Sequence, residues 1–233
     1  MNNSYSTQTY TPVSARAQEI RAAFITRTYM HVFGAILGFT AIEIFLFTNG
    51  LAEPIARTLL GGSWLIVLGA FMIVGWLASR VAHNASSQGA QYAALAGFVL
   101  AEAIIFVPLL YIAQLYAPGV IQSAAFVTLL GFTGLTAIAY YTRKDFSFLG
   151  GVLRWAGIGA LLLIVAGVIF GFELGTFFSV GMIVFAGAAI LYDTSNVLHH
   201  YPEDRHVGAA LELFASVALM FWYVLRLFMF SRD

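Results

Sequence analysis

Seven apolar stretches dominate this sequence, and each is long enough to cross a lipid bilayer as a helix. The hydrocarbon core of a bilayer is about 30 Å thick, so a crossing helix needs about 20 residues. Short segments rich in Asn, Gly, Ser and Pro separate the stretches and favour turns. The sequence therefore predicts an all-α, seven-transmembrane-helix bundle. The predicted spans are residues 24–48, 60–79, 89–114, 119–141, 152–171, 174–194 and 208–229.

The composition supports a polytopic membrane protein. The chain has 233 residues, of which 61% are hydrophobic and 9% are charged, whereas a soluble domain carries roughly 25% charged residues. A soluble domain of this size exposes too much surface to bury so many apolar side chains. The net charge is zero and there is no Cys. We therefore expect a lipid-bilayer partner and no nucleic-acid partner, and we exclude disulfides, thiolate catalysis and Cys-ligated metals.

The charge distribution predicts the orientation of the chain. Residues 1–20 are polar and lack the apolar segment of a signal peptide, so we expect a disordered N-terminal tail followed by one transmembrane domain, residues 21–233. Lys and Arg favour the cytoplasmic side, which predicts a cytoplasmic N-terminus. Seven crossings then place the C-terminus outside. If the last segment re-enters the membrane instead, the C-terminus returns inside, and Arg226 and Arg232 mildly favour that alternative. The basic residues on the predicted cytoplasmic side are Arg16, Arg21, Arg27, Arg80, Arg143, Lys144, Arg154 and Arg205, against Arg57 in the three opposite gaps.

Four carboxylates lie inside or at the edge of predicted spans, where ionisable groups are costly and often functional. Asp193 follows an uncharged run, and the flanks of Glu102 are wholly apolar, which favours a buried role. Glu43 has two interpretations, a buried group or a side chain that reaches the outer headgroups. Glu212 is the fourth carboxylate.

Two further residues share a helix face with Glu212. Ser216 lies one turn after it, and Arg226 lies two heptads after it. Arg226 is therefore either a counter-ion for Glu212 or an anchor at the membrane interface. Together the six residues form the candidate proton or ion site.

Enzyme motifs are absent from the sequence. It contains no Gly-x-Ser-x-Gly, no His-Glu-x-x-His and no Gly-rich phosphate loop, so we predict no enzyme, no catalytic residue and no cofactor. A secondary transporter would need matching helix breaks in two halves, which we do not find. His199, His200 and His206 neighbour charged residues. That pattern is more typical of a solvated loop than of a metal site.

Two inner motifs resemble the Bax-inhibitor (TMBIM) membrane protein family, and within it the bacterial YccA-like branch. Residues 189–200 (AILYDTSNVLHH) resemble the family's sixth-helix signature, and residues 142–151 (TRKDFSFLGG) resemble the fourth loop of that branch. Residues 27–29 are similar to the opening of the first helix, and residues 231–233 match the branch's ending. The resemblance covers the chain from about residue 20 to its end.

The resemblance implies a bundle of six helices around a central C-terminal helix. In the calcium-leak members of the family, aspartates on the sixth and seventh helices share a proton, because two close carboxylates cannot both ionise cheaply. Asp193 matches the first aspartate, whereas the second position is Ser216. Glu212, one turn earlier, could take the place of the second aspartate. A pH-sensitive Ca²⁺ or cation leak is therefore the alternative function.

The leading function implied by the resemblance is a different one. Members of the YccA-like branch are bacterial inner-membrane proteins that modulate FtsH, a membrane-anchored AAA protease. A polar N-terminal tail is a suitable handle for such a protease, and residues 1–20 fit that description. The resemblance thus implies an FtsH-type partner and an inner-membrane location, in which the outside C-terminus predicted from seven crossings is periplasmic.

Overall fold

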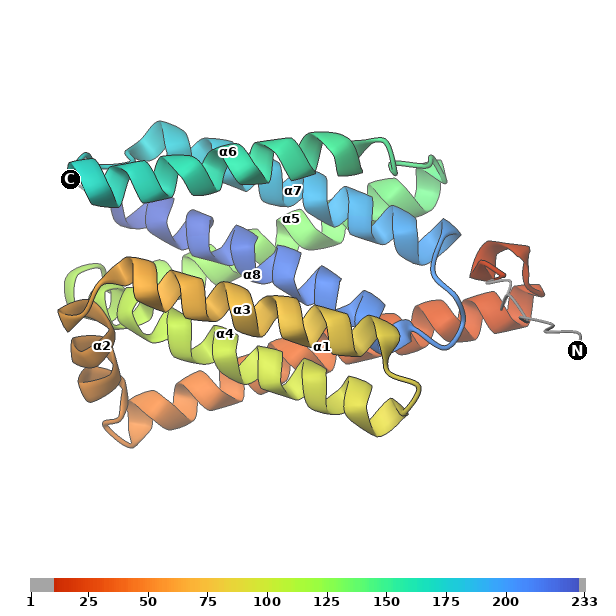
Figure 1. Ribbon diagram of the computed structural model, residues 1–233, viewed down its shortest axis with the longest axis horizontal. Coiled ribbons are helices and arrows are strands. Elements are labelled where there is room, and N and C mark those ends of the chain that lie inside the picture. Colours follow the sequence, from red (N-terminus) through yellow and green to blue (C-terminus); the bar gives the residue numbers. More distant parts are fainter. Residues whose placement is uncertain (1–10, 231–233) are drawn as a thin grey trace, which may run out of the picture.

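The computed structural model describes residues 11–230 as a bundle of helices, with no strand among the described residues (Figure 1). The elements are η1 (Val13–Ala15), α1 (Gln18–Thr48), α2 (Ala52–Gly61), α3 (Trp64–Asn84), α4 (Gln88–Tyr116), α5 (Val120–Thr142), α6 (Leu149–Phe170), α7 (Thr176–His199) and α8 (His206–Phe230).

The predicted seven-span architecture is confirmed. Seven helices are long and apolar enough to cross a membrane, namely α1 and α3 to α8. Each predicted span overlaps one of them. α7 continues to His199, so Asp193 lies inside a helix rather than at its edge.

α8 is the central helix of the bundle, as expected. It contacts α1, α3, α4, α5 and α7, and Leu211, Leu213 and Leu225 on it are almost completely buried. The expectation of six surrounding helices needs one correction, because within the described residues α6 contacts α7 and α3 but not α8. A cavity separates α6 from the central helix.

The direction of α8 favours a full crossing over the re-entrant alternative. α1 begins at the end of the bundle where the α7–α8 loop lies, and α8 runs through the bundle to the opposite end (Figure 1). The 25 residues of α8 are enough for a full crossing.

The sequence did not predict the short helix α2, because ten residues are too few to span a bilayer. Ala52 and Ala56 are buried against Val107 of α4, while Glu53 and Arg57 form an ion pair of 2.6 Å, one turn apart. Pro54 lies in the first turn of α2, where a missing N–H costs little. The helix therefore closes the end of the bundle between α1 and α3.

The second half of the predicted N-terminal tail is in contact with the bundle. Residues 1–10 lie outside the described residues, whereas Val13–Ala15 form a 3₁₀ turn and α1 begins at Gln18. Val13 is fully buried in a cluster with Phe24 and with residues of α7 and α8. This one apolar side chain anchors the segment before residue 20 to the bundle.

Candidate functional site

Asp193 and Ser216, the two positions that the sequence pairs across α7 and α8, are in direct contact. The Ser216 hydroxyl donates a hydrogen bond of 2.6 Å to Asp193 Oδ2. This distance is typical of a hydroxyl bound to a charged oxygen. Ser216 is buried, so the contact lies inside the bundle and joins its two most closely packed helices.

Glu212 lies one turn before Ser216 and is held by α3. The Ser79 hydroxyl donates a hydrogen bond of 2.6 Å to Glu212 Oε1, and His83 Nδ1 lies 3.8 Å from the same oxygen. Glu212 is also close enough to Asp193 for the two carboxyls to interact electrostatically. The two carboxyls and Ser216 therefore form one cluster, as the sequence suggested.

Arg226 does not pair with Glu212, so the counter-ion interpretation is wrong. Its guanidinium donates a hydrogen bond of 2.6 Å to the carbonyl of Leu174 in the α6–α7 loop and lies 5.4 Å from the Phe230 ring. Fourteen residues of helix separate the two side chains along α8 by about 21 Å. Arg226 instead ties the end of α8 to a neighbouring loop.

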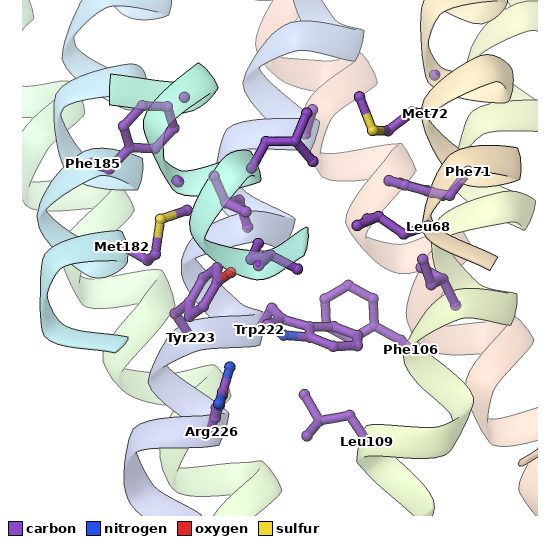
Figure 2. A pocket seen from close by; sticks show the side chains of 18 of the residues that line it. Leu68, Phe71, Met72, Phe106, Leu109, Met182, Phe185, Trp222, Tyr223 and Arg226 are labelled. Atoms are coloured by element: carbon purple, nitrogen blue, oxygen red, sulfur yellow. The ribbon is translucent and has the colours of Figure 1, made fainter. Parts of the chain in front are cut away.

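A cavity of about 1680 Å³ lies between α8 and the helices α3, α4, α6 and α7. Figure 2 shows its largely apolar wall, with Phe106, Trp222 and Met182 labelled near Arg226. The candidate residues that line the cavity are Glu102, Glu212, Ser216 and Arg226. Asp193 reaches it through its hydrogen bond to Ser216. Five of the six candidate residues are thus connected to one cavity.

Glu102 and Glu43 are both buried, but in different surroundings. Glu102 is 6% exposed on α4 and lines the cavity. Glu43 is 7% exposed, and neither of its carboxyl oxygens has a hydrogen-bond partner among the described residues. It is not part of the cavity lining. The headgroup interpretation of Glu43 is therefore wrong, because its side chain is buried within the bundle.

The sequence analysis missed the polar partners of this cluster. His83 Nδ1 lies 2.8 Å from the Ser79 carbonyl, and His83 Nε2 lies 3.0 Å from the hydroxyl of Tyr201. Burial raises the pKa of Tyr201, and the carboxylates of Glu212 and Asp193 raise it further. The only sequence signal was that His83 and Tyr201 fall on the same predicted side of the membrane.

The histidine-rich loop forms a hydrogen-bond network instead of a metal site. His200 Nε2 lies 3.1 Å from Asp145 Oδ2, and the Ser195 hydroxyl lies 3.3 Å from Asp145 Oδ1. A hydrogen bond from the Ser147 backbone N–H is the main cause that lowers the pKa of Asp145 to about 2, and His200 contributes. Within residues 11–230 no three His, Asp or Glu side chains gather in a way that could hold a metal ion. The network joins the α5–α6 loop to α7.

Comparison with known proteins identifies the family. A family model described as an inhibitor of apoptosis-promoting Bax1 matches residues 21–233. The chain belongs to the Bax inhibitor family. This confirms the resemblance that residues 189–200 and 142–151 suggested.

The relatives include bacterial and eukaryotic members of the family. The chain is 38% identical to an uncharacterized protein of Pseudomonas aeruginosa, over 47% of this chain and 49% of that protein. It is 34% identical to the modulator of FtsH protease YccA of Escherichia coli K12, over 49% of this chain and 52% of that protein. Each bacterial match spans about half the length of the relative. Bax inhibitor 1 of Schizosaccharomyces pombe is 28% identical, over 93% of this chain and 80% of that protein.

Proposed function

We propose that this Bax inhibitor family member is an inner-membrane modulator of an FtsH-type protease. The observation that carries the proposal is the 34% identity to the Escherichia coli protein of that name over 49% of this chain. The distribution of Lys and Arg favours a cytoplasmic N-terminus, which is the side from which an ATP-dependent protease would engage it.

The arrangement of the cytoplasmic segments supports this proposal. The start of α1, the α5–α6 loop and the α7–α8 loop lie at one end of the bundle (Figure 1). Arg143 and Lys144 are exposed in the α5–α6 loop, and Glu203 and Asp204 lie in the α7–α8 loop. This mixed-charge surface adjoins the N-terminal segment, whose Arg16 pairs with Glu203. It would be the contact area for the protease.

The test is a reconstituted degradation assay. An FtsH-type protease and a membrane substrate are placed in vesicles with and without an equimolar amount of this protein. We expect slower substrate degradation and co-purification of the two proteins. A variant that lacks residues 1–10 should still bind but should itself be degraded more slowly. Equal degradation rates with no co-purification would contradict the proposal.

A second candidate function is a proton-sensitive cation leak, favoured by the carboxyl cluster beside the cavity. Ionised Asp193 can only accept the hydrogen bond from Ser216, whereas protonated Asp193 can also donate one. Titration would therefore change the contact between α7 and α8. Glu212 and Glu102 would offer oxygen ligands to a hydrated cation in the cavity.

The leak is tested by Ca²⁺ flux into liposomes at about pH 6 and about pH 8, on either side of neutrality, since burial and a neighbouring carboxyl shift the titration of a carboxyl upward. We expect a pH-dependent flux in the wild type that Asp193→Asn abolishes. Glu43→Gln is the control, because Glu43 is also a carboxyl within a membrane-spanning helix but lies away from the cavity. Flux no greater than that of empty liposomes would exclude the leak.

A further inference from the structure

His83 occupies a position from which it can take up a proton from the cytoplasmic side. It is the second-last residue of α3, and its side chain is 28% exposed. The Ser79 carbonyl can only accept a hydrogen bond, so Nδ1 of the neutral ring carries the hydrogen that it donates there. Nε2 of this tautomer has a free lone pair. It therefore accepts its hydrogen bond of 3.0 Å from the Tyr201 hydroxyl.

Tyr201 is also the docking point of the N-terminal segment. The backbone N–H of Val13 donates a hydrogen bond of 2.9 Å to the Tyr201 carbonyl. The Tyr201 ring stacks on Phe24 at the start of α1, with 6.4 Å between ring centroids. One residue thus contacts the imidazole through its side chain and the N-terminal segment through its backbone.

Two further contacts hold the same segment on the α7–α8 loop. The Ser14 hydroxyl donates a hydrogen bond of 2.8 Å to the His199 carbonyl, and Arg16 forms an ion pair of 3.5 Å with Glu203. We call residues 13–16 the docked segment. Both of these additional contacts are partly exposed, so the buried contact of Val13 with Tyr201 is the central one.

We propose that His83 is a proton-binding residue that controls the docked segment through Tyr201. The inference deepens the proposed leak function, on which its consequence rests, because His83 contacts both Tyr201 and the carboxyl cluster at Glu212. Uptake of a proton releases the docked segment and opens the cytoplasmic approach to the carboxyl cluster.

The coupling follows from the hydrogen-bond capacities of the two side chains. A proton from water that binds Nε2 turns this nitrogen into a donor, so Tyr201 can no longer donate to it. The phenol keeps its own hydrogen, because burial raises the pKa of Tyr201. Its O–H must therefore rotate to another acceptor while Nε2–H donates to the phenol oxygen. Rotation of the O–H leaves the ring in place, but the imidazolium is drawn toward Glu212 Oε1, 3.8 Å from Nδ1, and away from the Tyr201 ring, whose centroid lies 5.8 Å from its own. This movement disturbs the packing that positions the Tyr201 carbonyl for Val13.

Charged and titratable groups of several elements face His83. Glu212 on α8 lies 3.8 Å from Nδ1, close enough to pair with an imidazolium. Asp193 and Tyr192 on α7 act on Tyr201, and Arg205 is turned away to the Ala85 carbonyl. Further titratable or charged side chains of the neighbouring elements are Arg80 on α3, His199 on α7, His206 on α8, Asp204 and Glu203 in the α7–α8 loop, and Arg16 in the docked segment.

The test measures the position of the docked segment directly. The chain contains no Cys, so Ala15→Cys and Lys144→Cys introduce the only two thiols for nitroxide labels. Both positions are exposed. Pulsed electron–electron double resonance in lipid vesicles then gives the distance between them. We expect one narrow distance at about pH 8 and loss of that distance at about pH 5.5, across the histidine range.

Three variants assign the response to the proposed residues. His83→Gln should keep the narrow distance at both pH values. Tyr201→Phe retains the ring packing and the backbone bond but lacks the hydroxyl, so it should also lose the pH response. His200→Gln, which removes a neighbouring histidine that contacts Asp145, should respond like the wild type.

The proposal would be overturned by a wild-type distance that does not change with pH, or by a response that persists in His83→Gln. The measurement needs neither flux nor a protease. A pH-dependent distance without Ca²⁺ flux would therefore exclude the leak and retain His83 as the controlling residue.

Discussion

α8 and α6 are both membrane-spanning helices of similar length, yet they occupy opposite environments. α8 has 25 residues and α6 has 22. Half of the residues in the most apolar 18-residue stretch of α8 are buried in the bundle. The structure describes all of α6, and Gly167 is its only buried residue. The more apolar of the two is α6, and it faces lipid.

The difference shows that apolarity does not mark the interior of a bundle in a membrane. Lipid tails are as apolar as leucine side chains, so small and polar residues mark the interior. α8 carries Glu212, Ser216 and Arg226, whereas the one charged residue of α6 is Arg154 near its start. The candidate site lies on α8 because a polar side chain is stable in a membrane only where partners surround it.

The largest expected effect is a loss of packing on α8. Leu213 is fully buried, so Leu213→Ala should reduce the free energy of unfolding. We expect a loss near the lower end of the range of about 2–5 kcal/mol, because lipid rather than water surrounds the side chain in the unfolded state. Leu162 on α6 is 63% exposed, and Leu162→Ala should change it by at most about 0.5 kcal/mol. Helical circular dichroism during unfolding in mixed micelles measures both. Equal losses would refute the contrast between the helices.

The hydrogen bond between α7 and α8 should come next. Ser216→Ala leaves Asp193 Oδ2 without the donor that it has at 2.6 Å, which should cost about 1–3 kcal/mol of unfolding free energy. Thr40→Ala is the control, because its hydroxyl bonds to the Ile36 carbonyl of its own helix on an exposed face. The same micelle unfolding assay applies. A loss no larger than that of the control would mean that water replaces the hydroxyl.

A pair of neighbouring glycines tests how closely α6 approaches α7. A Cβ at Gly150 would lie 2.8 Å from the Tyr192 ring, whereas a Cβ at Gly151 would meet no atom within 4 Å. Gly150→Ala should therefore cost about 1 kcal/mol, since the tyrosine ring must move. Gly151→Ala should stabilise the helix by about 0.5–1 kcal/mol. If both variants behave alike in thermal unfolding, α6 is not held against Tyr192.

The smallest effect is expected at the exposed Asp145 network. The pKa of Asp145 is lowered to about 2 from its ordinary 3.8, so its contacts stabilise the fold at all pH values above about 4 and are lost as the pH falls through about 2. The amide chemical shift of Ser147, whose N–H donates to Asp145 at 2.9 Å, should follow this titration. Asp145→Asn should abolish it. A midpoint near 3.8 in the wild type would contradict the proposed hydrogen bonding.

The sequence predicted the spans and the pairing of Asp193 with Ser216, but not the partners of Glu212. Span length is a local property, and the family resemblance supplied the pairing. The bond between Ser79 and Glu212 joins α3 to α8 across 133 residues, a tertiary contact that no local pattern encodes. The same limit explains the wrong predictions for Arg226, which bonds to the α6–α7 loop, and for Glu43, which the packing of the bundle buries.

The length of α1 has a consequence for the docked segment. Its 31 residues extend about 46 Å at about 1.5 Å per residue, some 16 Å more than a hydrocarbon core of about 30 Å. The excess lets the first turns project beyond the lipid, or lets the helix tilt. A thicker bilayer would draw more of α1 into the hydrocarbon and pull against the contact of Val13 with Tyr201. Membrane thickness, which lipid chain length sets in the same vesicles, would therefore act on the docked segment through α1.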